Sequence, residues 1–319
     1  MNFGYTKEFL LNLTDKEQAT PLHLAVNSGD PETVRTCLQN GAKVDVIQES
    51  KATALHYACS QGSLTIVQIL YDAFLEYQKQ QQGITSGDET DDPDVDRNLA
   101  SFLLELKDIL NMTALHRAAM YDHEPVVSFL IEKGANIESV DSQKRTPLLV
   151  SAVRGGSKSF FTLIGAGVSE QVEDVINRCV LHYLVMHWCT IDAQVTAYLE
   201  KVSKSSDGRK LLNKKDHWGY TPLHMAARDD NVKFTEALIG LGVVINLKDN
   251  EDRTPLHHTA KDQSNRTPLH LATQHGYADV IQVLLSIHRN LLDIKAKKGD
   301  HPAIIALHVV QFLPQNNHR

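Results

Sequence analysis

This sequence of 319 residues lacks the features that mark several large classes of protein. No apolar stretch approaches the roughly 18–20 residues that a membrane helix requires, so we expect no span of the bilayer in this chain. The first residues, MNFGYTKEF, hold no basic start followed by an apolar run, and we expect no secretory signal. The four cysteines form no dense framework, which favours a reducing compartment.

An excess of positive charge is also missing. Lys and Arg number 32 against 39 Asp and Glu, and the formal net charge is −7. Binding to phosphate backbones depends on clustered Lys and Arg, so nucleic acid is excluded as the main partner. No Ser-His-Asp or Cys-His arrangement has the local signature of a nucleophilic enzyme. We therefore predict no enzymatic activity and no cofactor.

What the chain does contain is a recurring four-residue motif, T-P-L-H or a close variant. Copies begin at residues 20, 53, 113, 146, 179, 221, 254 and 267, the copy at 179 being degenerate. The intervals are 33, 60, 33, 33, 42, 33 and 13 residues, and the value 33 is the period of ankyrin repeats. The residue five before each start is Asp in seven of the eight copies, with Gln48 as the exception, so the register extends beyond the motif itself.

Each motif position has a physical role in such a repeat. Thr caps a helix by accepting a hydrogen bond from an exposed backbone amide. Pro follows at the first helical position, where its missing N–H costs nothing, and Leu points into the stack. The Asp-led segment suits an extended turn, since Asp bonds readily to nearby backbone. A single unit cannot bury its apolar face, whereas stacked neighbours can.

The fold predicted is therefore an all-α ankyrin-repeat solenoid of stacked helix-turn-helix units with extended turn tips. We assign the structural role in this stack to one set of motif residues. They are Thr20, Pro21, Leu22, His23, Thr53, Leu55, His56, Thr113, Leu115, His116, Thr221, Pro222, Leu223, His224, Thr267, Pro268, Leu269 and His270.

Irregular intervals suggest how the chain is divided. We predict repeats over 1–80, an acidic disordered insert over 81–99, repeats over 100–300 and a degenerate or truncated end over 301–319. The 42-residue interval adds nine residues, which we place around Lys204–Gly208. The 13-residue interval leaves a half-repeat at 249–261. That half-repeat is either a real seam or the product of an altered transcript or gene model.

Three segments resemble sites of metal or phosphate chemistry. Four potential zinc ligands lie within eleven residues, at Cys179, His182, His187 and Cys189. Two of them occupy motif positions, so we interpret the group as structural rather than as a closed tetrahedral site. The run Asp92, Asp94 and Asp96 resembles a calcium loop but lacks its Gly and its closing Glu. Residues 155–159, GGSKS, lack the spacing of a phosphate loop and are expected to form a turn.

The motif histidines are likewise interpreted as structural hydrogen-bonding residues, and no metal site is predicted. Partner binding is assigned to the concave face that turn tips and first helices form in ankyrin arrays. Trp218, in His217-Trp218-Gly219, lies at a predicted turn tip and is the candidate partner contact. Packing against the adjacent tip is the other interpretation of this aromatic residue.

The residues between the motifs carry a closer resemblance. The stretches KEQATPLHLAVNSGD (16–30), MTALHRAAMYDHE (112–124), GANIESVDSQKRTPLL (134–149) and GYTPLHMAAR (219–228) resemble the cytoplasmic amino-terminal repeats of ankyrin-type transient receptor potential cation channels. The resemblance is best over 4–168, patchier over 172–203, and returns from Leu211. The chain departs from that family in the half-repeat, in lacking the six-helix pore region, and in lacking the segment that holds the family's main electrophile-sensing cysteines.

This resemblance implies a parent protein of the plasma membrane: a tetrameric, calcium-permeable nonselective cation channel gated by chemical or thermal stimuli. The segment would then be part of the cytosolic sensor or scaffold arm, and its partners would include channel subunits of the same kind. By itself the chain is not expected to conduct ions. The alternative hypothesis is a stand-alone soluble adaptor that holds partner proteins on its concave face.

Overall fold

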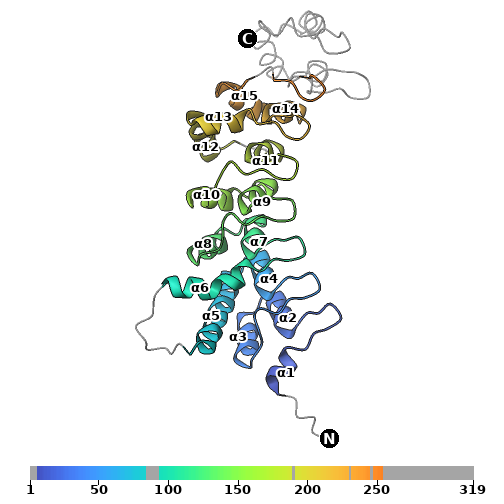
Figure 1. The fold of residues 1–319 in the computed structure, drawn as a ribbon, viewed down its shortest axis with the longest axis vertical. Helices are drawn as coiled ribbons and strands as arrows, with labels where there is room; N and C mark the ends of the chain where they lie inside the picture. The colour runs from blue at the N-terminus through green and yellow to red at the C-terminus, as the bar shows by residue number, and fades with distance from the viewer. Residues whose placement is uncertain (1–5, 84–92, 189–190, 230, 245–246, 254–319) are drawn as a thin grey trace, which may run out of the picture. The chain divides into compact units, whose positions relative to one another are not determined.

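A computed structural model describes residues 6–83, 93–188, 191–229, 231–244 and 247–253 of the chain. The described residues form fifteen α-helices and no strand, which confirms the all-α fold class (Figure 1). None of these described helices is both long enough and apolar enough to cross a membrane. The chain divides into two compact units, Met1–Val172 and Glu173–Arg319.

The first unit is built from two layers of helices. Its helices are α1 (Lys7–Leu11), α2 (Pro21–Ser28), α3 (Pro31–Gln39), α4 (Ala54–Gln61), α5 (Leu64–Gln81), α6 (Pro93–Glu105), α7 (Ala114–Met120), α8 (Glu124–Glu132), α9 (Pro147–Arg154) and α10 (Ser157–Gly165). Helices α2, α4, α7 and α9 pack one on the next, and α3, α5, α8 and α10 form the second layer beside them (Figure 1). Each motif therefore begins a helix of the first layer.

The second unit repeats this plan with one addition. Its helices are α11 (Val180–His187), α12 (Ala193–Lys204), α13 (Ser206–Leu212), α14 (Pro222–Arg228) and α15 (Val232–Gly240). Helix α11 packs on α14, while α14 packs on α15. The nine extra residues of the 42-residue interval contribute to α13, whose start is capped by the Ser205 hydroxyl accepting a hydrogen bond from the Gly208 amide at 2.9 Å.

Burial of the motif leucines holds the layers together. Leu22 and Leu55 are fully buried, and Leu115 and Leu223 are nearly so. Burying one such side chain contributes about 1.5–3 kcal/mol. Alanines such as Ala58 on α4 and Ala118 on α7 are also fully buried. Because these side chains are small, neighbouring first-layer helices approach closely.

The acidic insert differs from the prediction. Helix α5 runs for 18 residues, whereas α3, α8, α10 and α15 run for nine, and α6 already begins at Pro93. Residues 93–99 thus belong to a helix, not to a disordered segment, and residues 84–92 lie outside the described part. Buried Leu103 and Leu104 on α6 provide the physical reason, because they supply an apolar face that packs against α5.

Several predictions fall on residues that the structure does not describe. Of the half-repeat at 249–261 only residues 249–253 are described. The motif copy at Thr267, Pro268, Leu269 and His270 and the end at 301–319 lie outside the described residues. The boundaries assigned to these parts stay predictions.

Candidate protein-docking face

The site begins with how the motif starts each first-layer helix. Thr113 is the N-cap of α7, and its side chain accepts a hydrogen bond from the His116 amide at 3.4 Å. In return the Thr113 amide donates to Nδ1 of His116 at 3.2 Å. The same reciprocal arrangement, a capping box, begins α2, α4, α11 and α14. Two backbone amides that the helix itself leaves unpaired are satisfied in this way.

This geometry also sets the protonation of the histidine ring. Because Nδ1 accepts an N–H, a neutral ring carries its proton on Nε2. Nε2 then donates to a backbone carbonyl of the following repeat: His56 to Met112 (3.1 Å), His116 to Arg145 (3.0 Å), His182 to Tyr220 (2.9 Å) and His224 to Arg253 (3.1 Å). Each of these carbonyls belongs to the residue that precedes the next motif copy. The motif histidine therefore joins one repeat to its successor.

Burial keeps the rings of His23, His56 and His116 neutral. Desolvation lowers the pKa of His116 to about 4, although the hydrogen bond to the Arg145 carbonyl acts in the opposite direction. Burial lowers the pKa of His23 and of His56 as well. A charged imidazole would lose its Nδ1 acceptor and so break the capping box. In the geometry observed these rings make structural hydrogen bonds.

An aspartate organises each described hairpin tip except the one that begins at Gln48. One carboxylate oxygen of Asp141 accepts hydrogen bonds from the amides of Gln143 and Arg145, both at 2.8 Å. Asp15, Asp108, Asp174, Asp216 and Asp249 make the same pair of bonds two and four residues ahead. The second oxygen of Asp141 binds the guanidinium of Arg145 at 2.8 Å. Such pairing explains why a buried carboxylate is tolerated at the tip.

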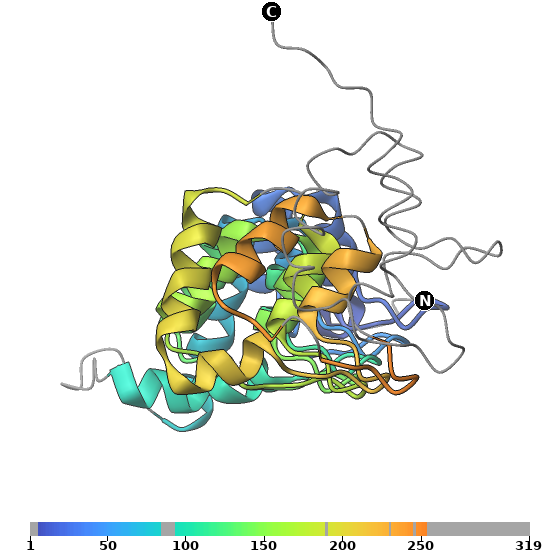
Figure 2. The same cartoon turned by 90° about the horizontal axis from the view of Figure 1, so that it is seen from above.

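Successive tips are tied to each other. In the first unit the Ile109 amide donates to the Ser50 carbonyl, and the Ser142 amide donates to the Leu110 carbonyl, both at 2.8 Å. In the second unit the His217 amide donates to the Ile176 carbonyl at 2.8 Å. Seen from above, the hairpins of the first unit project from one side of its helix layers (Figure 2). We call the surface made by hairpin tips and first-layer helices the hairpin face.

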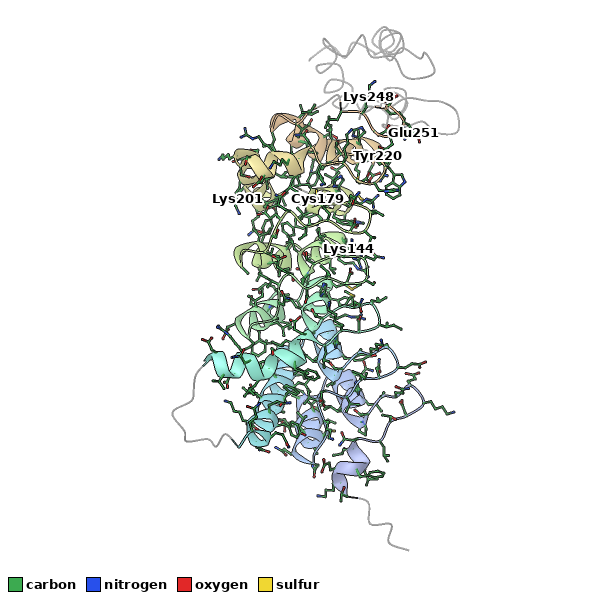
Figure 3. All side chains as sticks on the ribbon, in the orientation of Figure 1. Lys144, Cys179, Lys201, Tyr220, Lys248 and Glu251 are labelled. Carbon is green, nitrogen blue, oxygen red and sulfur yellow. The ribbon has the colours of Figure 1, made fainter. Side chains whose placement is uncertain are left out.

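Apolar side chains remain exposed on this hairpin face. In the first unit Ile47, Ile109, Leu110 and Val140 are 47%, 61%, 49% and 41% exposed. In the second unit Val175 and Trp218 are 54% and 45% exposed. Glu251, at another tip of the second unit, lies on the opposite side of the helices from Lys201 on α12 (Figure 3). Aliphatic and aromatic groups held at fixed positions in water are typical of protein-binding surfaces.

Trp218 is interpreted either as a partner contact or as a residue that packs against the adjacent tip, and its surroundings fit both. The Arg178 guanidinium lies 5.3 Å from the centre of the indole, on the neighbouring tip, and the His217 ring meets it edge-on at 5.5 Å. The Trp218 carbonyl accepts a hydrogen bond from Asn250 at 3.1 Å. Trp218 is thus packed on one side and open on the other, so its role as a partner contact remains a proposal.

The four potential zinc ligands take different places. Cys179 is the N-cap of α11, with Sγ 3.1 Å from Nδ1 of His182, so both residues fill the positions of Thr and His in the capping box. His187 stacks on Tyr183, with ring centres 6.1 Å apart, and Cys189 lies outside the described residues.

Of the acidic run, Asp94 pairs with Arg97 at 3.3 Å and Asp96 with Lys79 at 2.6 Å. Of residues 155–159, Gly155 and Gly156 form the predicted turn between α9 and α10, but residues 157–159 are the first turn of α10.

Sequence reasoning missed a second set of links between repeats. His123, at the start of α8, places Nε2 3.0 Å from the Ser60 carbonyl. Asp122 accepts a hydrogen bond at 2.8 Å from the Ser159 amide in the first turn of α10. The only signal for them was a polar residue recurring where the second helix of a repeat begins. Their partners lie one repeat or more away, so the local pattern could not name them.

Stacked helical hairpins with ordered tips and an exposed apolar face define a protein-interaction repeat module. The family model for ankyrin repeats, in three copies, matches residues 3–81, 94–174 and 181–298. The chain belongs to the ankyrin-repeat family. The human ASB11 ankyrin repeat domain has the same fold, with a TM-score of 0.56 and 19% sequence identity over 77% of this chain and 94% of that one.

Curated relatives include cation channels. Transient receptor potential cation channel subfamily A member 1 of Drosophila melanogaster is 33% identical over 90% of this chain and 24% of its own length. The Homo sapiens protein of that name is 28% identical over 96% of this chain and 26% of its own length. The chain thus spans about a quarter of the length of these relatives. The B-cell lymphoma 3 protein homolog of Mus musculus is 32% identical over 48% of this chain and 30% of its own length.

Proposed function

We propose that this chain is the cytosolic docking arm of a cation channel subunit similar to transient receptor potential subfamily A channels. The arm holds partner proteins, including further subunits of a tetramer, on its hairpin face. The observation that carries the proposal is the row of exposed Ile47, Ile109, Leu110 and Val140 on hairpins that backbone hydrogen bonds join to one another. Buried aspartates, Asp108 and Asp141, also fix the hairpins of Ile109, Leu110 and Val140. The parent protein is a calcium-permeable channel of the plasma membrane in this proposal.

A rigid tip is what makes these residues suitable as contacts. Ordering a loop on binding costs free energy, so a tip that is already ordered keeps more of its contact energy as affinity. In the hairpin that carries Ile109 and Leu110, the Asp108 carboxylate binds two backbone amides at 2.8 and 2.9 Å and also the Arg117 guanidinium. Support for the channel comes from the relatives that match nearly the whole of this chain.

A stand-alone adaptor is the alternative, because the B-cell lymphoma 3 protein homolog also matches part of the chain. Sequencing transcripts across the codon of Arg319 separates the two. We expect an open reading frame that continues into several hydrophobic helices of about 20 residues each. A stop codon directly after this segment in every transcript of an intact locus would favour the adaptor.

Fractionation of native tissue supplies the matching test on protein. With an antibody against residues 100–172, we expect the antigen in the membrane fraction, released by detergent and not by salt. Recovery of the antigen in the soluble fraction alone would contradict the proposal.

A further inference from the structure

The 60-residue interval builds a groove that a regular repeat array does not have. One repeat period after α3 ends at Gln39, α5 is expected to end near Asp72, yet it continues to Gln81. The added turns of α5, which follow Asp72, lie beside the end of α3 and the loop that follows α3. Between them opens a cavity of about 580 Å³. That volume lies within the range of about 300–1,000 Å³ that is typical of ligand sites.

Helix α6 holds the added turns in place. Phe74 is buried, and its ring stacks on Phe102 with centres 6.4 Å apart. The Lys79 ammonium pairs with the Asp96 carboxylate at 2.6 Å. Both contacts join the extension of α5 to α6. The two helices lie next to each other in Figure 1. The groove wall is therefore a packed helix and not a loose end.

Charge and apolar surface are divided within the groove. Four carboxylates line it, from Glu8, Asp45, Asp72 and Glu76, against two bases, Arg35 and Lys43. Among the described residues none of these four carboxylates forms an ion pair, whereas Arg35 already contacts Glu32 at 3.7 Å. The groove thus carries a net negative charge, with four carboxylates against two bases in its lining.

Apolar side chains line the groove as well. Leu38 and Ile69 line it together with Tyr77, which is 45% exposed. Desolvation raises the pKa of Asp72, and the charges of Lys133 and Arg35 act in the opposite direction. Removing a carboxylate from water strengthens its attraction for a cation that enters the same space.

We propose that this groove binds a short basic segment of a partner protein, with Lys or Arg side chains on the carboxylates and an apolar side chain against Tyr77. The groove lies on the second helix layer, away from the hairpin face, so the inference does not depend on the proposed function. A segment of opposite charge pattern is excluded by repulsion from the rim.

The test is a titration of the full chain with an amidated peptide, Arg-Leu-Arg-Leu-Arg, that carries a terminal nitroxide label. We expect NMR signals of Asp72, Glu76 and Tyr77 to broaden, and binding by the peptide Glu-Leu-Glu-Leu-Glu to be undetectable. Replacing two carboxylates, Asp72→Asn with Glu76→Gln, should weaken binding of the basic peptide by about five- to tenfold. Tyr77→Ser should weaken it without changing its salt dependence.

A matched control removes the same charge elsewhere. Glu200→Gln with Glu236→Gln changes two exposed carboxylates of the second unit, so binding should change by less than about twofold. Circular dichroism of every variant should match that of the unchanged chain. Equal weakening of peptide binding by the control pair would overturn the inference. So would broadening of the NMR signals of Ile109 and Leu110 in place of those of the groove residues. Neither result would contradict the proposed function of the hairpin face.

Discussion

Nε2 of His116 lies 3.0 Å from the carbonyl oxygen of Arg145, and this hydrogen bond joins one repeat to the next. Nδ1 of the same ring accepts a hydrogen bond from the Thr113 amide. A single side chain therefore caps its own helix and also binds the next repeat. Four histidines of the described chain make such a link. In a repeat stack, stability is roughly the sum of unit and interface contributions, so each link acts on a defined interface.

Removing one ring should therefore weaken the first unit measurably. His116→Ala leaves the Thr113 amide unpaired, removes one of the two hydrogen bonds that the Arg145 carbonyl accepts, and opens a buried cavity. We expect a loss of about 2–4 kcal/mol in the free energy of unfolding, measured with urea. Lys158→Ala, at an exposed position on α10, is the control and should change it by less than about 0.5 kcal/mol. A loss below about 1 kcal/mol for His116→Ala would show that the link contributes little.

Acid should destabilise the fold through these same rings. The pKa of His116 is about 4 in the folded chain, below the ordinary value of 6.5, so the unfolded chain binds protons first as pH falls. The contribution is fully present above about pH 7 and decreases as pH falls through 6.5 toward 4. For this ring alone we expect about 2 kcal/mol to be lost between about pH 7 and pH 5. Urea titrations at both pH values should show a smaller loss in His116→Gln, and an equal loss in that variant would contradict the assignment.

Substitutions at two glycines can distinguish the cost of backbone strain from the cost of a steric clash between repeats. Gly29 and Gly62 both end first-layer helices with φ of 75°. A Cβ atom at Gly62 would lie 2.3 Å from Nδ1 of His123, whereas nothing lies within 4 Å of one at Gly29. We expect Gly29→Ala to cost about 1 kcal/mol, from the left-handed backbone alone, and Gly62→Ala to cost about 2–4 kcal/mol.

The His123 ring explains the difference in that prediction. In a chain that already carries His123→Ala, Gly62→Ala should cost no more than Gly29→Ala does. Urea unfolding of the four variants measures this coupling as a double-mutant cycle. A cost at Gly62 that persists without the ring would place the strain elsewhere.

The hairpin face should bind partners without being needed for folding. Ile109→Ser with Leu110→Ser alters side chains that are 61% and 49% exposed, so the free energy of unfolding should change by less than about 1 kcal/mol. Recovery of partners that co-purify with the full chain from detergent-solubilised membranes should fall by about fivefold or more, measured by quantitative mass spectrometry. The control is Phe9→Ser with Leu10→Ser on α1, where exposure is 48% and 49%. Equal losses from both pairs would remove the special role of the hairpin face.

Much of the stack could be predicted from sequence because its determinants are local. The capping box joins residues three apart, and the tip aspartate binds amides two and four residues ahead, so a short motif encodes both. The prediction that residues 93–99 are disordered is wrong. It rests on the run of aspartates and does not take account of Leu103 and Leu104, which are buried on the same helix. Acidic residues in the first turn of a helix are favourable, which the composition alone does not show.

The groove lay beyond sequence reasoning for a different reason. Glu8, Asp45 and Glu76 come from three segments, and only the packing of α5 against α6 and α3 brings them to one cavity. The length of the 60-residue interval pointed to an irregularity at this place. The interval length did not show that the extra residues would extend α5 and form one side of a groove.

The most direct test of the account is the protonation of the motif histidines, observed by nitrogen-15 NMR of the ring nitrogens at neutral pH. We predict that His56, His116 and His224 carry the proton on Nε2, with Nδ1 unprotonated, and that these protons exchange slowly with water. Rings that are protonated on Nδ1, or that exchange rapidly and titrate near their ordinary pKa, would contradict the claim that these histidines join the repeats.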